Sequence, residues 1–306
     1  MTHRLSLQFS LMRVKNVHFI LNPGAGAEEP ILSHINKVFC DNNIKWAISI
    51  TQKKNDAFNF AKQLIGKTDV VAVYGGDGSL AEVARALCGT DTPMAIIAGG
   101  TANIMAKELG VSLDALESLE LLKSGRLKVI KMDIGSVNNH PFILRVNLGI
   151  MADMIINTDS KLKAKIGQLA YGITAIDSIV NAQSVNYHLS IDGKKINEKG
   201  VTLTVTNVGS LGIGNFELLP GISVTDGFLD VILMKDTGIL DMFKIAGSTL
   251  FQTDSDVLMR WRCREITINM DKSTSFICDD FEKKAKRLRI KILPAALKVV
   301  VPANLN

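Results

Sequence analysis

The chain has 306 residues, of which 47% are hydrophobic and 21% are charged, and its formal net charge is +5. This composition supports a hydrophobic core and excludes an intrinsically disordered chain. No apolar run reaches the ~18 residues that span a bilayer, and the small positive charge does not indicate a nucleic-acid-binding protein.

The N-terminus and the cysteines both favour a cytoplasmic protein. The first residues lack a long apolar segment and a small-residue cleavage site, so we expect no signal peptide, and Met12 is an alternative start to Met1. Four scattered cysteines have no metal-binding spacing, so we expect free thiols in a reducing cytosol. They are Cys40, Cys88, Cys263 and Cys278.

Apolar strands alternate with helical patterns up to Arg126. Strands that are apolar along their whole length and separated by helices are typical of a parallel sheet covered on both faces. The expected strands are residues 14–21, 45–51, 69–74 and 93–98, and the expected helices are residues 30–41, 55–65, 79–88, a segment ending at 109, and 113–123.

After Arg126 the pattern changes to short strands with turn residues between them. Asn138-Asn139 predicts a tight hairpin, Asp192-Gly193 and Asp226-Gly227 mark further turns, and one helix is expected over residues 166–182. These signals favour an antiparallel β-sandwich or flattened barrel. The expected strands are residues 128–139, 140–150, 185–192, 199–208, 227–234, 259–264, 264–270, 274–280 and 287–293.

The sequence therefore predicts two domains. Residues 1–127 form an α/β nucleotide-binding domain with a mostly parallel sheet, and residues 128–294 form a β-sandwich domain. Residues 295–306 end in an apolar, β-branched run that is suited to rejoin the first domain. No linker of low complexity separates the two domains.

Three glycine-rich loops each follow an apolar strand: NPGAG at residues 22–26, GGDGS at 75–79 and GGTAN at 99–103. In a parallel sheet the carboxyl ends of the strands share one edge, where ligands bind. Glycines let backbone amides approach a ligand, and a helix that starts after the loop favours phosphate. One such loop alone is often a plain turn, but three at one edge favour a phosphate site. The loops match neither the Walker A nor the Rossmann motif.

These motifs in this order resemble the diacylglycerol kinase-like lipid kinases, in particular their bacterial branch, over nearly the whole chain. NPGAG resembles the family's N-P-x-S-G, GGDGS its G-G-D-G-T, and GGTAN its G-T-x-N loop. TDGFLDV, at residues 225–231, resembles the D-G-x-L-D-V stretch that follows a metal-binding turn.

The resemblance implies an ATP site in a cleft between the two domains, with Mg²⁺ as the metal and a lipid alcohol as the substrate. It places a metal near Ser223, Asp226 and Phe228, where a plain turn is the alternative interpretation. It also gives Asp77 a catalytic role. The residues expected at ATP are Asn22, Thr51, Gly75, Gly76, Asp77, Gly78, Ser79, Glu82, Thr101 and Asn103.

The family's general base lies in a late D-G-E motif, which Asp280-Phe281-Glu282 matches with phenylalanine in place of glycine. Glu282 is the expected base, because a carboxylate accepts the proton of the attacking hydroxyl. Asp280 is its partner or substitute. A phenylalanine does not readily adopt a glycine conformation, so an altered or inactive kinase stays open. An acidic surface turn is the plainer interpretation.

Three functions therefore compete. The first is an ATP-dependent lipid kinase, cytoplasmic, bound peripherally to membranes and able to form a homodimer. The second is an NAD kinase, which also has a G-G-D-G loop and a β domain. The third is a nucleotide-binding regulatory protein without catalysis. Residues 259–264 and Lys161, Lys163 and Lys165 are candidate membrane contacts, although a strand with one wet face and a solvated helix start are the simpler interpretations.

Overall fold

The computed structural model describes residues 12–25, 29–40, 43–149, 184–210, 220–235, 258–279 and 281–303. The chain forms two compact units. The N-terminal unit is Met1–Met132 together with Leu297–Asn306, and the C-terminal unit is Asp133–Ala296. Among the described residues, no helix combines the length and apolar character that crossing a bilayer requires.

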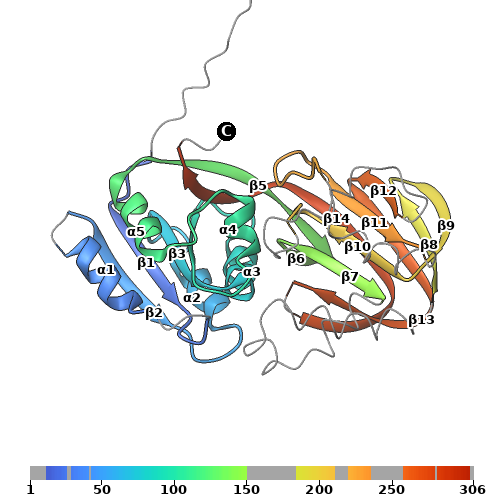
Figure 1. The fold of residues 1–306 in the computed structure, drawn as a ribbon, viewed down its shortest axis with the longest axis horizontal. Helices are drawn as coiled ribbons and strands as arrows, with labels where there is room; N and C mark the ends of the chain where they lie inside the picture. Colours follow the sequence, from blue (N-terminus) through green and yellow to red (C-terminus); the bar gives the residue numbers. More distant parts are fainter. Residues whose placement is uncertain are drawn as a thin grey trace, which may run out of the picture. The chain divides into compact units, whose positions relative to one another are not determined.

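The N-terminal unit is built on a parallel sheet (Figure 1). Its strand order is β2–β1–β3–β4, and the last part of β14 joins the sheet through a parallel pairing of Val299 with Met94 of β4. The β3 strand is buried along its whole length, which explains why its sequence is apolar without alternation. The strands are β1 (Asn16–Leu21), β2 (Lys45–Ile50), β3 (Val70–Gly75), β4 (Met94–Ala98) and β14 (Phe281–Pro302).

Helices connect these strands. Residues of α1 and α5 share a core with Phe19 of β1 and Tyr74 of β3, whereas α2 packs against α3 and α3 against β3. Each predicted helix of this unit is present within a few residues of its expected bounds. The helices are α1 (Ile31–Phe39), α2 (Asp56–Leu64), α3 (Asp77–Leu87), α4 (Ile104–Glu108) and α5 (Ala115–Ser124).

The C-terminal unit is an antiparallel β structure with two layers around one core. The order β12–β11–β10–β7 continues into β13, β8 also pairs with β13, and β9 pairs with β8. The strands are β5 (Leu127–Val137), β6 (His140–Phe142), β7 (Arg145–Gly149), β8 (Val185–Ile191), β9 (Lys194–Gly200), β10 (Thr202–Thr206), β11 (Leu229–Met234), β12 (Leu258–Cys263) and β13 (Glu265–Cys278).

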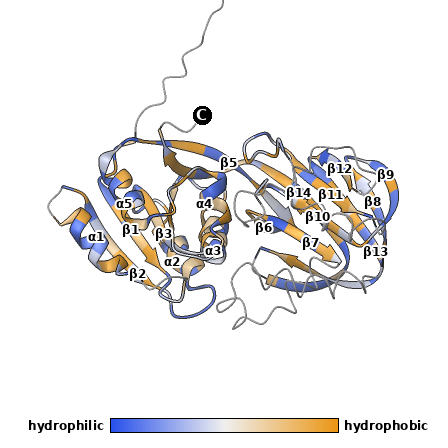
Figure 2. Cartoon of the chain, in the orientation of Figure 1, coloured by the Kyte–Doolittle hydropathy of each residue, from blue (hydrophilic) through white to orange (hydrophobic). Residues whose placement is uncertain are grey.

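The long strand β13 makes the two layers by changing its partner. Residues 266–270 pair with β8, residues 276–278 pair with β7, and the register with β14 shifts between Asn269 and Thr274. Such an irregularity bends a strand and increases its twist. The core between the layers includes Leu189 of β8 and Val146 of β7, and Figure 2 shows hydrophobic and hydrophilic residues alternating along these strands.

The predicted fold class is confirmed, and so are two hairpin turns. Asn138 and Asn139 have positive φ values of 48° and 66° in the β5–β6 turn, and Asp192 and Gly193 turn between β8 and β9. The sequence missed β9, whose KKINEKG is mostly charged, and split β13 into two strands at its irregularity. The helix expected at 166–182 lies outside the described residues.

Candidate functional site

The three glycine loops lie at the carboxyl ends of β1, β3 and β4, which are adjacent parallel strands in the order β1–β3–β4. A parallel sheet brings these ends to one edge. The loops are therefore neighbours in space although the sequence separates the first from the third by the whole of α1, β2, α2 and α3.

Asn22 joins the first loop to the second. Its side-chain Nδ2 donates to Ser79 Oγ at 2.9 Å, and its Oδ1 accepts from the backbone N–H of Gly24 at 3.0 Å. Its own backbone N–H donates to Tyr74 O in β3. The asparagine thus fixes the NPGAG turn and the first turn of α3 together, which explains why this residue type stands here.

Asp77 joins the second loop to the third. It is the first residue of α3, and its two carboxylate oxygens accept from the backbone N–H groups of Ile104 and Met105, at 3.0 and 3.1 Å. These N–H groups belong to the first turn of α4, which has no intrahelical partner for them. Asp77 therefore caps the helix of the neighbouring loop.

Close backbone packing completes the connection. A Cβ atom on Gly100 would lie 2.4 Å from the Cα atom of Gly76, so these two loops touch at a distance that only glycine allows. Asn103 holds the third loop in shape: it has φ +50°, its Oδ1 accepts from Gly100 N–H at 2.9 Å, and its Nδ2 donates to Gly100 O at 2.8 Å.

The resulting platform is suited to bind an anion. The N-terminus of α3, at Asp77, Gly78 and Ser79, is half-exposed, and the first intrahelical bond runs from Leu80 N–H to Gly76 O. The earlier amides of the helix point out of its end and carry the positive end of its dipole. An eleven-residue helix that follows a glycine loop is a phosphate-binding arrangement.

Three further residues of the expected ATP set have different surroundings. Thr101 is exposed within the third loop, and Thr51 directly follows β2, where its hydroxyl donates to Leu21 O at 3.3 Å. Glu82 is only 7% exposed, and its Oε1 accepts from the N–H of Asn55, the residue that precedes α2, at 2.8 Å. The Glu82 carboxylate therefore anchors the start of α2, a contact that the sequence did not indicate.

In the C-terminal unit, the turn expected to bind metal is already hydrogen-bonded. Asp226 Oδ1 accepts from Phe228 N–H at 3.0 Å, and its Oδ2 forms a 2.7 Å ion pair with Arg262. The Ser223 hydroxyl lies 3.3 Å from that of Thr225. The Arg262 guanidinium also stacks on the Phe228 ring, 4.7 Å from its centroid.

This donor set does not fit a Mg²⁺ ion as it stands. Mg²⁺ is usually held by one or two free carboxylates, with waters or phosphate oxygens completing an octahedron, and the Asp226 carboxylate is paired with an arginine. No group of three or more potential ligand side chains exists among the described residues. The turn is instead held by Asp133, whose Oδ2 accepts from Gly227 N–H and whose Oδ1 accepts from Ala295 N–H. The sequence signal that could have identified Asp133 is an aspartate within the strand-like segment KVIKMDIG.

The expected base lies at the β13–β14 hairpin. Cys278 pairs with Phe281, and Asp279, which follows Cys278, has a positive φ of +46°. Phe281 is therefore a strand residue, packed against Phe276 and His140. Glu282 pairs with Ile277 and is exposed, and Asp280 lies outside the described residues.

Asp279 has a structural role that the sequence did not indicate. Its carboxylate accepts from three successive backbone N–H groups, those of Ile143, Leu144 and Arg145, at 2.8 to 3.1 Å. These residues lie between the end of β6 and the start of β7. The acidic hairpin thus fixes its neighbours through Asp279, while Glu282 on the following strand faces solvent.

The arginines of β12, at alternate positions of the strand, form ion pairs within the C-terminal unit. Arg260 forms a 2.7 Å ion pair with Asp230, whose side chain is 2% exposed, and Arg262 pairs with Asp226. Burial raises the pKa of Asp230, and the neighbouring Arg260 opposes that rise. Trp261 packs against the core. These contacts favour a strand with one wet face over a membrane-contact edge. Lys161, Lys163 and Lys165 lie outside the described residues.

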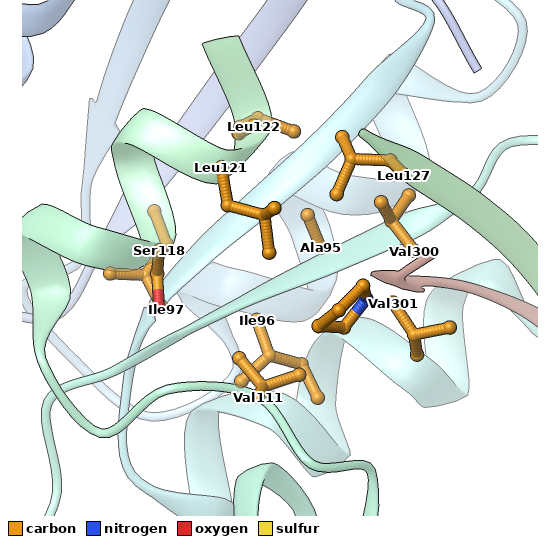
Figure 3. A pocket seen from close by; sticks show the side chains of 11 residues that line it. Ala95, Ile96, Ile97, Val111, Ser118, Leu121, Leu122, Leu127, Val300 and Val301 are labelled. Atoms are coloured by element: carbon orange, nitrogen blue, oxygen red, sulfur yellow. The ribbon is translucent and has the colours of Figure 1, made fainter. Parts of the chain in front are cut away.

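A small apolar pocket lies in the N-terminal unit, between β4, α5 and the end of β14 (Figure 3). Side chains such as Ile96, Leu121 and Val300 line it, and Ser118 is its polar exception. Its volume of about 20 Å³ is enough for roughly one water molecule. It does not hold a nucleotide or an acyl chain.

Two family models cover most of the chain. Residues 16–137 match the diacylglycerol kinase catalytic domain, and residues 145–301 match the YegS C-terminal NAD kinase beta sandwich-like domain. The chain belongs to the diacylglycerol kinase-like lipid kinase family. This confirms the resemblance that the glycine loops indicated.

Relatives and solved structures agree with this assignment. The chain is 28% identical over 243 residues to the diacylglycerol kinase of Bacillus subtilis (strain 168), covering 78% of this chain and 79% of that protein. It is 28% identical over 298 residues to a probable lipid kinase, YegS-like, of Klebsiella pneumoniae (strain 342), covering 93% and 95%. A crystal structure of a diacylglycerol kinase from Bacillus anthracis str. Sterne shares the fold, with a TM-score of 0.78, 21% identity and coverage of 96% and 100%.

Proposed function

We propose that this protein is an ATP-dependent lipid kinase that transfers the γ-phosphoryl group to the hydroxyl of a lipid, of the diacylglycerol or sphingoid type. The observation that carries the proposal is the set of three glycine loops that Asn22 and Asp77 join into one platform. Membership of the lipid kinase family supports the choice of a lipid over a soluble acceptor. The enzyme then works from the cytoplasm, bound peripherally to the membrane.

In this proposal the N-terminal amides of α3 bind the phosphates of ATP. The amides of Gly78 and Ser79 and the hydroxyl of Thr101 donate to phosphate oxygens, since phosphoryl transfer depends mainly on positioning and charge neutralisation. Asn22 and Asp77 act as positioning residues, because their side chains bond to neighbouring loops. Magnesium complexed with ATP would supply the neutralisation of phosphate charge that such a transfer needs.

Glu282 is the proposed base. Its carboxylate accepts the proton of the lipid hydroxyl as the oxygen forms its bond to the γ-phosphorus and the bond to the ADP oxygen breaks. Glu282 is exposed and therefore accessible to a substrate. Asp280 is the proposed substitute.

One observation favours a second function, a nucleotide-binding protein without transferase activity. Cys278 pairs with Phe281, which makes Phe281 the first strand residue after the turn. The family's D-G-E motif can also be aligned so that its aspartate and glycine occupy the turn. In that alignment its glutamate corresponds to Phe281 and not to Glu282. The side chains of Phe281 and Glu282 lie on opposite faces of β14, because successive residues of a strand alternate.

The test is transfer of labelled γ-phosphate from ATP and Mg²⁺ to diacylglycerol, sphingosine, ceramide and phosphatidylglycerol in mixed micelles, with NAD as a soluble acceptor. Wild type is compared with Asp77→Ala, Asp280→Ala and Glu282→Ala. Glu120→Ala is the matched control, since Glu120 is an exposed glutamate on α5.

The proposal requires label on one lipid, lost in Asp77→Ala and Glu282→Ala and retained in Glu120→Ala. Label on NAD in place of any lipid overturns the lipid kinase. Activity that survives Glu282→Ala and is lost in Asp280→Ala moves the base to Asp280. ATP binding without transfer to any acceptor supports the regulatory protein.

A further inference from the structure

The outer face of one layer of the C-terminal unit is polar and open. This layer includes β9, β8, the first part of β13 and the adjoining part of β14, in that order, and β5 also pairs with β14. Paired residues lie on the same face of a sheet. The register therefore places on this outer face the residues Lys195, Asn197 and Lys199 of β9, Asn186, His188 and Ser190 of β8, Glu265, Thr267, Asn269 and Asp271 of β13, and Arg287, Arg289 and Lys291 of β14.

Cations outnumber carboxylates on this face. Its five lysines and arginines are all exposed, and none of them forms an ion pair with another residue that the structure describes. One of the two carboxylates, Asp271, is engaged with His188 and Asn186. The cations are Lys195, Lys199, Arg287, Arg289 and Lys291, and we call this set the basic face.

Three cations of the basic face lie close together along β14, and the register places one carboxylate, Glu265, opposite Lys291. Arg287, Arg289 and Lys291 follow one another along β14 at about 7 Å intervals, the distance between alternate residues of a strand. Like charges at this distance repel, since it lies within the Debye length of about 8 Å at physiological salt. A partner that carries many negative charges would relieve this repulsion.

The face has no apolar centre for a protein partner. Its remaining members are Asn, Ser, Thr and His, whereas the core of a stable protein interface is depleted in charge and rich in aromatic residues. The outer positions of the other layer differ, because Thr202 and Thr204 of β10 are 4% and 5% exposed. The basic face, in contrast, is exposed in the described part of this unit.

We propose that the basic face docks the protein on an anionic lipid bilayer. Clusters of lysine and arginine bind acidic headgroups, and a twisted sheet face offers several such side chains to a surface at once. The inference complements the proposed function, since a lipid kinase must reach a substrate that is held in a bilayer. It does not depend on phosphoryl transfer, and it assigns the membrane contact to residues other than the arginines of β12.

The test is co-sedimentation with vesicles in the absence of ATP. Wild type is mixed with vesicles of phosphatidylcholine alone or of equal parts phosphatidylcholine and phosphatidylglycerol. The triple variant Arg287→Thr, Arg289→Thr, Lys291→Thr removes three charges and keeps strand-forming side chains. The control variant Lys37→Gln, Lys62→Gln, Lys67→Gln removes the same charge from exposed positions of the N-terminal unit.

Wild type should bind the anionic vesicles and not the neutral ones, and binding should weaken with salt. The triple variant should bind about a hundredfold more weakly, from about fivefold for each charge near the surface, and the control variant should bind like wild type. Circular dichroism and ATP binding at wild-type levels show that the triple variant is folded.

Equal losses in both variants, or no loss in the triple variant, overturn the proposal. Binding to double-stranded DNA but not to vesicles also overturns it, if the triple variant loses the DNA binding, because the basic face is then a nucleic-acid-binding surface. Vesicle binding by a protein that transfers no phosphate to any lipid supports the docking surface and contradicts the kinase activity. Failure of the docking proposal and failure of the proposed function are therefore distinguishable.

Discussion

The glycine loops of the N-terminal unit and the acidic turns of the C-terminal unit use their polar side chains differently. In the loops, Asn22 and Asp77 each bond a neighbouring loop and leave helix amides at the surface. In the turns, Asp226 and Asp279 bond arginine or backbone groups of their own unit. The first arrangement builds a platform suited to bind an anion, and the second stabilises a fold. The contacts of a candidate residue are therefore a better guide to its role than its residue type. The question is whether those contacts leave hydrogen-bonding groups exposed to a ligand.

Gly100→Ala should break the platform most severely. Its Cβ would meet the Gly76 Cα atom at 2.4 Å, so two backbones must separate. We expect an ATP affinity lower by on the order of a hundredfold and a stability loss of about 3 kcal/mol, measured by calorimetric titration and thermal unfolding. Gly24→Ala is the control, because its Cβ meets only Asn22 Oδ1, at 3.4 Å. Equal behaviour of the two variants contradicts the close packing of these loops.

Arg260→Ala should reduce stability without affecting ATP. It leaves Asp230 buried without its ion-pair partner, at a cost of about 3 kcal/mol. Arg262→Ala, two residues away, removes an ion pair with the more exposed Asp226 and should cost about 1 kcal/mol. Urea unfolding measures both. Similar stability losses in the two variants would show that burial does not make the Arg260–Asp230 pair the stronger one. A loss of ATP affinity in either variant would show that the ion pairs of the C-terminal unit affect nucleotide binding.

Asp77→Ala should cost about 2 kcal/mol of stability, because two N–H groups of α4 lose their acceptor. Its ATP affinity should fall as the third loop moves. Asp77→Asn keeps one acceptor oxygen and should fall between the alanine variant and wild type in both measurements. A variant that unfolds like wild type while losing only catalysis would show that Asp77 acts directly on the substrate and is not a positioning residue.

Glu82→Ala should affect nucleotide binding less than Asp77→Ala does. Its carboxylate caps α2, so we expect a stability loss of about 1 kcal/mol and an ATP affinity within about threefold of wild type. Glu82→Gln keeps an acceptor for Asn55 N–H and should recover part of the stability. A loss of ATP affinity as large as that of Asp77→Ala would return Glu82 to the nucleotide site.

Local patterns predicted much of this molecule. Uninterrupted apolar strands followed by glycines identified the parallel sheet and its ligand edge, and Asn138-Asn139 identified a hairpin, because in each case neighbouring residues alone set the conformation. The family could also be predicted from local sequence, because each of its motifs is a short run of neighbouring residues.

Contacts between distant segments were not predictable. The Asp77 bonds to residues 104 and 105, and the Glu82 cap on Asn55, depend on how helices pack across the sheet. Strand β9 was missed because charged residues occupy positions on both of its faces, so that its sequence does not alternate. The position of the turn before Phe281 depends on the pairing of Cys278 with Phe281. Register of this kind is set by the whole core rather than by turn residues alone.

Amide hydrogen exchange with and without ATP and Mg²⁺ tests the joined platform most directly, since it reports each loop separately. The account predicts slower exchange on nucleotide binding at residues 22–25, 75–79 and 99–103 together, with Gly100→Ala abolishing the protection in all three loops. Protection confined to one loop, or retained in Gly100→Ala, would contradict a single site built from three connected loops.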